Sequence, residues 1–138
     1  MNIKKLKENA VIPTYGSEYA AGADLYAAID NPVTIAPGAT EFIGTGLAME
    51  IPMGYARSGL SCKEGLAPAN KVGVVDADYR GEITVALYNH SNEAKTVEPG
   101  DRIAQMVIAP FLKVDFTEVG ELSKTVRGVG GFGSTGNK

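Results

Sequence analysis

The sequence predicts an all-β fold, a sandwich or barrel built from many short strands. Turn signals recur along the chain, with "APG" at 36–38, "IPMG" at 51–54 and "EPG" at 98–100. The runs between these turns are short and rich in Val, Ile, Thr and Tyr, and no segment has a long helical periodicity. Short strands separated by regular turns are typical of β-sandwiches and barrels, which is why we expect this fold class.

Three short segments indicate the first elements in chain order. The run "KKLK" at 4–7 favours a solvated strand edge, because lysines at an edge prevent unwanted pairing. "SGLSCKEGL" at 58–66 is the only stretch that fits a helix, and the expected helix is short. The apolar run "VGVV" at 72–75 predicts a strand that leads into a polar turn.

The next two strands follow from clearer patterns. "EITVALYN" at 82–89 alternates two sets of side chains, with Ile83, Val85 and Leu87 on one face and Thr84, Ala86 and Tyr88 on the other. This period of two predicts a half-buried strand. "RIAQMVIAPF" at 102–111 is apolar, follows Pro-Gly-Asp and contains Pro110, so we expect a strand with a break at the proline.

Composition limits the class of protein. The 138 residues suffice for one domain with a core, and the values of 44% hydrophobic and 21% charged residues are typical of globular proteins. A net charge of −3 argues against binding of polymeric nucleic acid, although a few converging arginines suffice for a small anion.

The same composition favours a cytoplasmic protein. Cys62 is the single cysteine, which excludes an intrachain disulfide and fits a reducing compartment. We expect no membrane segment, because no run of about 18 apolar residues occurs. We also expect no secretory signal, because the N-terminal segment has no apolar core.

The glycine-rich segment "RGVGGFGSTGNK" at 127–138 is unlike the rest of the chain. Its glycines match G-x-G-x-x-G and nearly match a Walker A loop, but no helix can follow and the Walker lysine is missing. Backbone N–H groups of such a turn can still bind an anion. From the residues alone, both a frayed end and an arm that orders over a ligand remain open. We take 1–126 as the β-barrel domain and 127–138 as a separate glycine-rich segment.

A second dense segment is "KVGVVDADYRGEI" at 71–83. Asp76 directly follows the apolar run, so we expect it to be partly buried, where a carboxylate can activate a water molecule. Tyr79 offers a flat face for a sugar, and Asn70 can donate and accept hydrogen bonds at once, as a pyrimidine edge requires. The alternative is an ordinary polar hairpin turn.

A third segment, "ARSGL" at 56–60, combines a guanidinium, a hydroxyl and an unhindered backbone N–H. These groups, from Arg57, Ser58 and Gly59, suit the oxygens of a phosphate. As an isolated triplet they also fit an ordinary surface loop.

These segments, in this order, resemble the motifs of the trimeric deoxyuridine triphosphate nucleotidohydrolases, the dUTPases. The set consists of "AGADLYAA" at 21–28, the two segments above, "GDRIAQM" at 100–106 and the glycine-rich arm. The resemblance implies a jelly-roll β-barrel that forms a homotrimer with active sites shared between subunits. It also implies hydrolysis of dUTP to dUMP and pyrophosphate, with Mg²⁺ on the triphosphate, which limits uracil entry into DNA and supplies dUMP.

The resemblance also implies roles for individual residues. Asp76 matches the residue that activates the attacking water, and Tyr79 matches the aromatic ring under the deoxyribose. Asp24 matches the acidic residue near the waters of the metal. The uracil-reading hairpin corresponds to Asn70, Gly73, Val74 and Val75, and the phosphate ligands correspond to Arg57, Ser58, Gly59 and Gln105. The segment 127–138 matches a mobile arm that closes over the active site. In this arm, Arg127 matches a catalytic arginine at the far phosphate, Phe132 matches a ring over uracil, and further contacts are implied for Gly133, Ser134 and Thr135.

One feature departs from the family pattern. Tyr55 and Arg57 are separated by Ala56 alone, where the family has a further handful of residues that form a strand. A strand usually needs about five or six residues. Either this strand is shortened or a piece of the sequence is missing, and the placement of the Arg-Ser-Gly triplet depends on which is true.

Two other functions are compatible with the same fold. A dCTP deaminase would need a glutamate that shuttles protons at the base, and the motifs here look unlike that family. A non-catalytic, nucleotide-sensing trimer is the other alternative, and the complete set of candidate catalytic residues argues against it.

Overall fold

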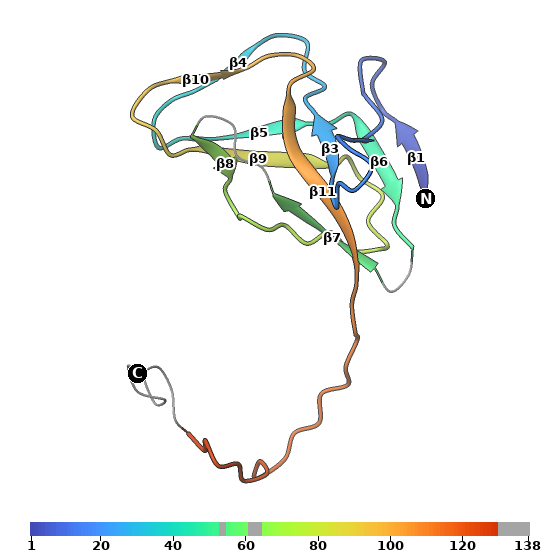
Figure 1. Cartoon of the computed structure of the whole chain (residues 1–138), viewed down its shortest axis with the longest axis vertical. Coiled ribbons are helices and arrows are strands. Elements are labelled where there is room, and N and C mark those ends of the chain that lie inside the picture. Colours follow the sequence, from blue (N-terminus) through green and yellow to red (C-terminus); the bar gives the residue numbers. More distant parts are fainter. Residues whose placement is uncertain (53–54, 61–64, 130–138) are drawn as a thin grey trace.

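The computed structural model describes residues 1–52, 55–60 and 65–129, with the backbone alone for 55–60. Eleven strands and no helix occur in this described part (Figure 1). They are β1 (Asn2–Lys5), β2 (Thr14–Tyr15), β3 (Ala23–Tyr26), β4 (Val33–Ile35), β5 (Thr40–Gly44), β6 (Leu47–Glu50), β7 (Tyr55–Leu60), β8 (Leu66–Pro68), β9 (Thr84–Asn89), β10 (Lys95–Val97) and β11 (Arg102–Pro110). The prediction of an all-β fold is confirmed.

The strands form antiparallel sheets that enclose one core. The two larger sheets have the strand orders β2-β3-β11-β7 and β5-β9-β8, and two-stranded ribbons join β1 to β6 and β10 to β4. One hydrophobic cluster unites residues from both larger sheets, such as Leu25 of β3, Ile43 of β5, Leu87 of β9 and Met106 of β11. The inner faces of the sheets therefore pack against each other, as in a jelly roll.

The alternation predicted for 82–89 is confirmed in β9. Val85 and Leu87 are buried, whereas Thr84 is exposed. β9 pairs with β5 along one edge and with β8 along the other, so it is the central strand of its sheet. Both edges of β9 are thus paired, and its apolar face supplies the core on that side.

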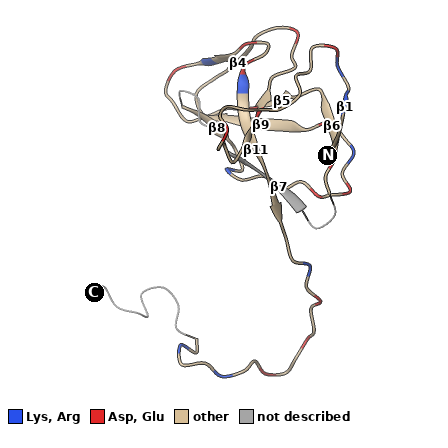
Figure 2. Ribbon diagram, turned by 45° about the vertical axis from the view of Figure 1, so that its right-hand side comes forward, with Lys and Arg blue, Asp and Glu red and all other residues tan. Residues whose placement is uncertain are grey.

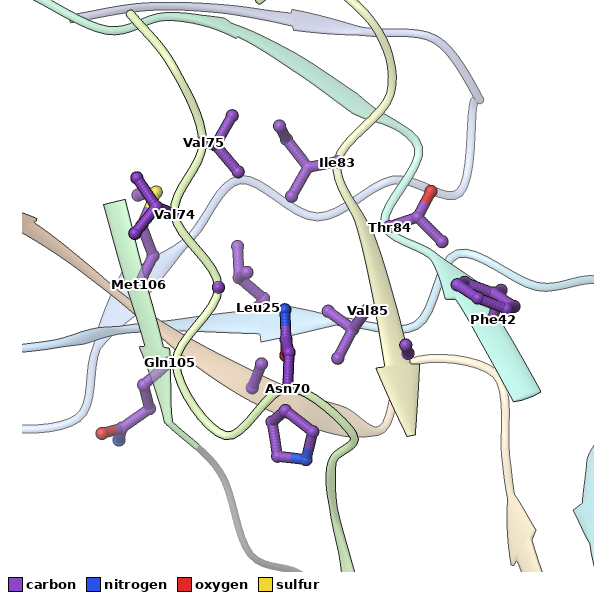
Figure 3. A pocket seen from close by; sticks show the side chains of 14 residues that line it. Leu25, Phe42, Asn70, Val74, Val75, Ile83, Thr84, Val85, Gln105 and Met106 are labelled. Atoms are coloured by element: carbon purple, nitrogen blue, oxygen red, sulfur yellow. The ribbon is translucent and has the colours of Figure 1, made fainter. Parts of the chain in front are cut away.

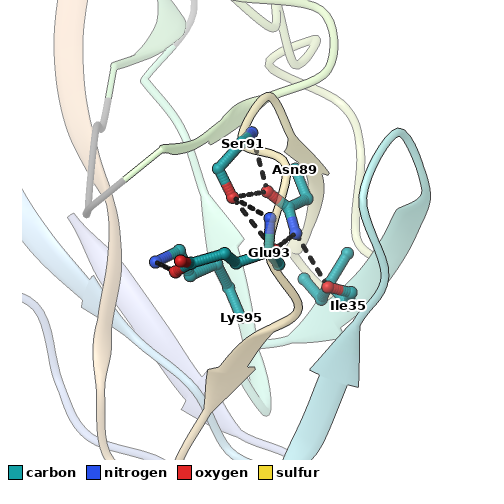
Figure 4. Close-up of polar contacts among 5 residues, drawn as sticks. All are labelled: Ile35, Asn89, Ser91, Glu93 and Lys95. Atoms are coloured by element: carbon teal, nitrogen blue, oxygen red, sulfur yellow. Dashed lines mark hydrogen bonds and ion pairs between the residues drawn. The ribbon is translucent and has the colours of Figure 1, made fainter.

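The far end of β9 is held by a buried amide. Asn89 is fully buried, and its Nδ2 donates to the carbonyls of Ile35, at 2.8 Å, and Glu93, at 2.7 Å. Its Oδ1 accepts from the backbone N–H of Ser91 at 2.9 Å and from the Ser91 hydroxyl at 2.7 Å (Figure 4). Each polar atom of this amide has a hydrogen-bond partner, so its burial in the core carries little free-energy penalty.

The strand predicted for 102–111 is also confirmed. β11 ends at Pro110 and pairs with β3 through its first half and with β7 through its second. The expected lysine-rich strand edge is β1, whose Lys4 and Lys5 are exposed. Among the described residues β1 pairs only with β6, so its lysines do lie on an edge strand.

Two sequence predictions differ from the structure. The helix expected over 58–66 is not found, because Ser58–Leu60 pair with β11 as the end of β7 and Leu66 begins β8, while 61–64 lie outside the described residues. The strand expected over 72–75 is also wrong. This run is a loop held by its own backbone, in which Lys71 has a φ of 57° and the Val72 N–H donates to the Asn70 carbonyl at 2.5 Å.

Beyond β11, residues 111–129 contain no strand and leave the barrel as an extended segment (Figure 1). Large apolar side chains in this segment are exposed, with Leu112 at 92% and Phe116 at 95%. The division at residue 126 stays a prediction, since the last strand already ends at Pro110.

Charges are scattered over the described molecule. Figure 2 shows basic and acidic residues interspersed along the strands, the loops and the extended segment. Within the described ranges, there is no helix that is long and apolar enough to cross a membrane.

Candidate active site

A cavity of about 260 Å³ opens where the 68–75 loop meets both large sheets (Figure 3). Five of the predicted substrate residues line it, namely Asn70, Gly73, Val74, Val75 and Gln105. Its apolar floor comes from the core, with Leu25, Val85 and Met106. The cavity thus offers an apolar bed with a few polar groups at its rim, which is the usual make-up of a small-molecule site.

The turn that carries Asn70 is tightly closed. The Lys71 N–H donates to the Pro68 carbonyl at 2.8 Å, and Lys71 itself has a positive φ. This brings the Asn70 side chain against Gly73, where an added Cβ would lie 2.7 Å from Asn70 Nδ2. Glycine at 73 therefore leaves the space that the Asn70 amide occupies.

A second hollow, of about 300 Å³, adjoins the first. Asp76, Tyr79 and Glu82 line it together with Val74 and Val75, which also line the first cavity. Val74, which is 70% exposed, and Val75 therefore form the wall shared by the two hollows, together with Ile83 and Thr84. A ligand that spans this wall would contact Asn70 at one end and Asp76 at the other.

The turn between Asp76 and Glu82 is held by its own hydrogen bonds. The Asp76 carbonyl accepts from the Tyr79 N–H at 3.2 Å, and the Tyr79 hydroxyl donates to the Glu82 carbonyl at 3.1 Å. Arg80 Nη1 donates to the carbonyls of Ala77 and Tyr79, at 2.8 and 3.0 Å. Asp76 itself is exposed, so the expectation that it is partly buried is wrong, because the run before it is a surface loop and not a core strand.

Asp24 lies on β3, opposite Gln105 of β11, and is only 6% exposed. Its Oδ1 accepts from Gln105 Nε2 at 3.0 Å, and its Oδ2 pairs with Arg102 Nη1 at 3.4 Å. The structure thus joins the predicted metal-side carboxylate to the predicted phosphate ligand Gln105. Among the described residues no group of three His, Cys, Asp or Glu side chains forms a metal cage.

The Arg-Ser-Gly triplet lies within a strand. In β7, Arg57 pairs with Ile108, Ser58 with Val107 and Gly59 with Met106. The six residues Tyr55–Leu60 therefore form the partner strand of β11, and the triplet is part of it. This backbone path runs toward Gln105, which is the register partner of Leu60.

The arm is only partly described. Arg127 is exposed, belongs to the extended segment beyond β11 and is not among the residues that line either hollow. Gly128 has a φ of 53°, and its N–H donates to the Thr125 carbonyl at 3.2 Å. Four predicted arm contacts lie outside the described residues, namely Phe132, Gly133, Ser134 and Thr135.

Glu82 and Phe42 are among the lining residues of these hollows that sequence reasoning did not single out. Glu82 follows the Asp-Tyr-Arg-Gly turn directly, and that position was the available signal. Phe42, on β5, is 74% exposed and lines the first cavity, and nothing in its local sequence pointed to that place.

Comparison with known proteins identifies the family of the chain. The family model for dUTPase matches residues 8–136. The deoxyuridine 5'-triphosphate nucleotidohydrolase of Nautilia profundicola is 52% identical, over 99% of this chain and 98% of its own. That of Idiomarina loihiensis is 47% identical, over 96% of this chain and 91% of its own.

Solved structures show the same likeness. A variant of the phage 80alpha dUTPase is 28% identical, with a TM-score of 0.84 and coverage of 96% of both chains. A Staphylococcus bacteriophage 80alpha dUTPase with dUpNHpp is 27% identical, with a TM-score of 0.80, over 98% of this chain and 97% of that one. With the family model matching nearly the whole length and relatives about half identical to it, the chain belongs to the dUTPase family.

Proposed function

We propose that this protein hydrolyses dUTP to dUMP and pyrophosphate in the cytoplasm. The observation that carries the proposal is the pair of adjoining hollows, which puts Asn70 and Gln105 at one and Asp76 and Tyr79 at the other. The names of the similar proteins, deoxyuridine 5'-triphosphate nucleotidohydrolases, support the same reaction.

Selection of the base belongs to the first cavity. Asn70 and the backbone of the 73–75 loop face a space of about 260 Å³ with an apolar floor. We expect the backbone of this loop to exclude the extra methyl of thymine from a bound base. Cytosine would leave buried donors or acceptors unpaired, which a polar pocket rejects strongly.

The chemical step belongs to the second hollow. Asp76 is the only acidic side chain besides Glu82 that lines it among the described residues. The Asp76 carboxylate accepts a proton from water as the water oxygen attacks phosphorus, and the bond between the α- and β-phosphates breaks to release pyrophosphate. Tyr79 lies beside it with its ring available to pack under deoxyribose.

Magnesium fits the residues near Asp24 as an ion held mainly by substrate. Both Asp24 carboxylate oxygens already accept from protein groups, and no protein cage surrounds them in the described ranges. Mg²⁺ usually keeps several waters and binds through one or two carboxylates plus phosphates. Bound on the triphosphate, it would neutralise the charge that develops on the phosphate oxygens. Asp24 would then orient the water ligands of the Mg²⁺ ion.

A homotrimer would cover the extended segment. Leu112, Val114 and Phe116 are exposed and alternate with Lys113 and Asp115, which is the pattern of a strand with one apolar face. Exposed apolar surface of this kind marks an interaction site. A neighbouring copy is the occupant that we propose, and Arg127 and the arm would then act at a site shared between subunits.

Product analysis tests the function directly. The full-length protein with Mg²⁺ and dUTP should release pyrophosphate and dUMP, and should leave dTTP and UTP largely intact. Ammonia release from dCTP would instead identify a deaminase. Tight dUTP binding without turnover would identify a nucleotide-sensing protein and contradict the proposal.

A further inference from the structure

The carboxylate of Glu82 lies in a space left by the turn that contains Gly44 and Gly46. Its Oε1 accepts a hydrogen bond from the Gly46 N–H at 2.8 Å, and the side chain is part-buried. A Cβ at Gly44 would clash with that same Oε1, so the absence of a side chain at 44 makes the space. A charge-assisted hydrogen bond of this kind is stronger than a neutral one.

This turn between β5 and β6 also holds the start of β9. The Thr45 hydroxyl and backbone N–H both donate to the Ile83 carbonyl, at 2.7 and 3.1 Å, and the Ile83 N–H donates to the Leu47 carbonyl at 2.8 Å. These bonds fix Ile83. Through its hydrogen bond to Gly46, the Glu82 carboxylate also ties residue 82, just before Ile83, to the β5–β6 turn.

That same peptide positions Tyr79. The Tyr79 hydroxyl donates to the Glu82 carbonyl at 3.1 Å. Its ring lies so close to Gly81 that a Cβ at 81 would clash with the hydroxyl and the ring carbons. The orientation of Tyr79 is therefore set by the backbone at 81–82, and Glu82 ties this backbone to the β5–β6 turn.

We infer that Glu82 is a positioning residue that holds Tyr79 in the orientation that discriminates deoxyribose from ribose. This inference rests on the proposed function, in which Tyr79 packs under the sugar. Glu82 acts through the carbonyl that Tyr79 uses and through its bond to Gly46. Asp76 remains the base.

The test compares two substitutions at Glu82 in the full-length protein. Glu82→Ala removes the acceptor for Gly46, and Glu82→Gln keeps an acceptor oxygen. For Glu82→Ala, the ratio of kcat/KM for dUTP to that for UTP should fall about 5- to 10-fold, the scale of one hydrogen bond. Glu82→Gln should keep the ratio within about 2-fold, since it can still accept from Gly46.

Thr45→Val is the matched control for stability. It removes a buried side-chain hydrogen bond at the same turn and leaves Glu82 in place. Its melting temperature should fall, and its dUTP to UTP ratio should stay unchanged. If Glu82→Ala folds and lowers only the melting temperature, Glu82 has a structural role and the inference is overturned.

A double-mutant cycle with Tyr79→Phe tests the link itself. Removal of the Tyr79 hydroxyl should lower the ratio less in the Glu82→Ala background than in the wild type. Additive effects would overturn the inference. If Glu82→Ala does not fold, Glu82→Asp replaces it, because the shorter side chain withdraws the carboxylate from Gly46 and should lower the ratio.

Two further outcomes separate the inference from the proposed function. A kcat for Glu82→Gln that falls as far as that of Asp76→Asn would make Glu82 the base and overturn the positioning role. Absence of dUTP hydrolysis by the wild type would overturn the function itself. Normal wild-type hydrolysis with an unchanged ratio in Glu82→Ala would overturn this inference alone.

Discussion

At the scale of single residues, Asp76 and Asp24 show how two carboxylates of one site differ. Asp76 is exposed and lines an open hollow, so it can reach a water molecule and a substrate. Asp24 is buried, and both of its carboxylate oxygens are engaged by Gln105 and Arg102. This contrast favours Asp76 for the proposed proton transfer and Asp24 for the proposed orientation of neighbouring groups.

Asp76→Asn should therefore lose turnover and keep binding. The amide is nearly isosteric with the carboxylate but is a poor base, and general-base catalysis contributes about 10²- to 10⁴-fold. We expect kcat for dUTP to fall at least about 100-fold, with KM changed by no more than a few fold. Steady-state measurement of pyrophosphate release checks this, and near-normal release would remove Asp76 from the mechanism.

Gly73 is the residue whose side chain would disturb the base pocket. Gly73→Ala should push the Asn70 amide from its place, because the new Cβ would lie 2.7 Å from Nδ2. Since Asp76 lies in the adjoining hollow, we expect KM for dUTP to rise about tenfold, the scale of one lost polar contact, while kcat stays within a few fold. A kcat loss without a KM change in Gly73→Ala would contradict the role in base binding.

At the scale of elements, regular patterning allowed some strands to be predicted and local backbone geometry hid others. β9 was predictable because Val85 and Leu87 alternate with Thr84 over a run long enough to show a period of two. The run at 72–75 is just as apolar, but Gly73 and the left-handed Lys71 turn it into a loop that closes on itself. Apolar composition alone does not distinguish these outcomes, because the hydrogen bonds of the loop are not encoded in hydrophobicity.

β7 illustrates a different limit of sequence reasoning. The Arg-Ser-Gly triplet was expected at a loop or helix start, but it lies in a strand, because Tyr55–Leu60 pair with the second half of β11. The partner segment lies far along the chain, so no local pattern could reveal this register. Asn70, Val74, Asp76 and Tyr79 were singled out from the sequence and line adjoining hollows, while their roles stay predictions.

At the scale of the whole molecule, the barrel and the extended segment differ in how far their apolar side chains are buried. The barrel buries a continuous apolar cluster, whereas residues 111–129 leave Leu112, Phe116 and Leu122 exposed. Apolar side chains gain free energy only when they are covered, at about 25 cal/mol per Å². In a homotrimer the segment up to Val126 would be covered by a neighbouring copy, and the glycine-rich arm would follow at that copy's site.

Removal of residues 127–138 separates these two parts. No strand lies in the removed segment as far as the structure describes it, so the barrel should persist and light scattering should still report a trimer. Nucleotide binding should weaken only moderately, because Asn70, Val74 and Gln105 remain in the barrel. Turnover should fall much further, by about 10³-fold or more, since one arginine at the developing phosphate charge is worth that much in rate.

Arg127→Ala in the full-length chain is the matched variant, and it should reproduce most of the loss if the arginine is the decisive group. A truncated trimer that hydrolyses dUTP at the full-length rate would show that the arm takes no part in catalysis, and a truncated protein that is monomeric would place trimer contacts in the arm instead of in 111–126.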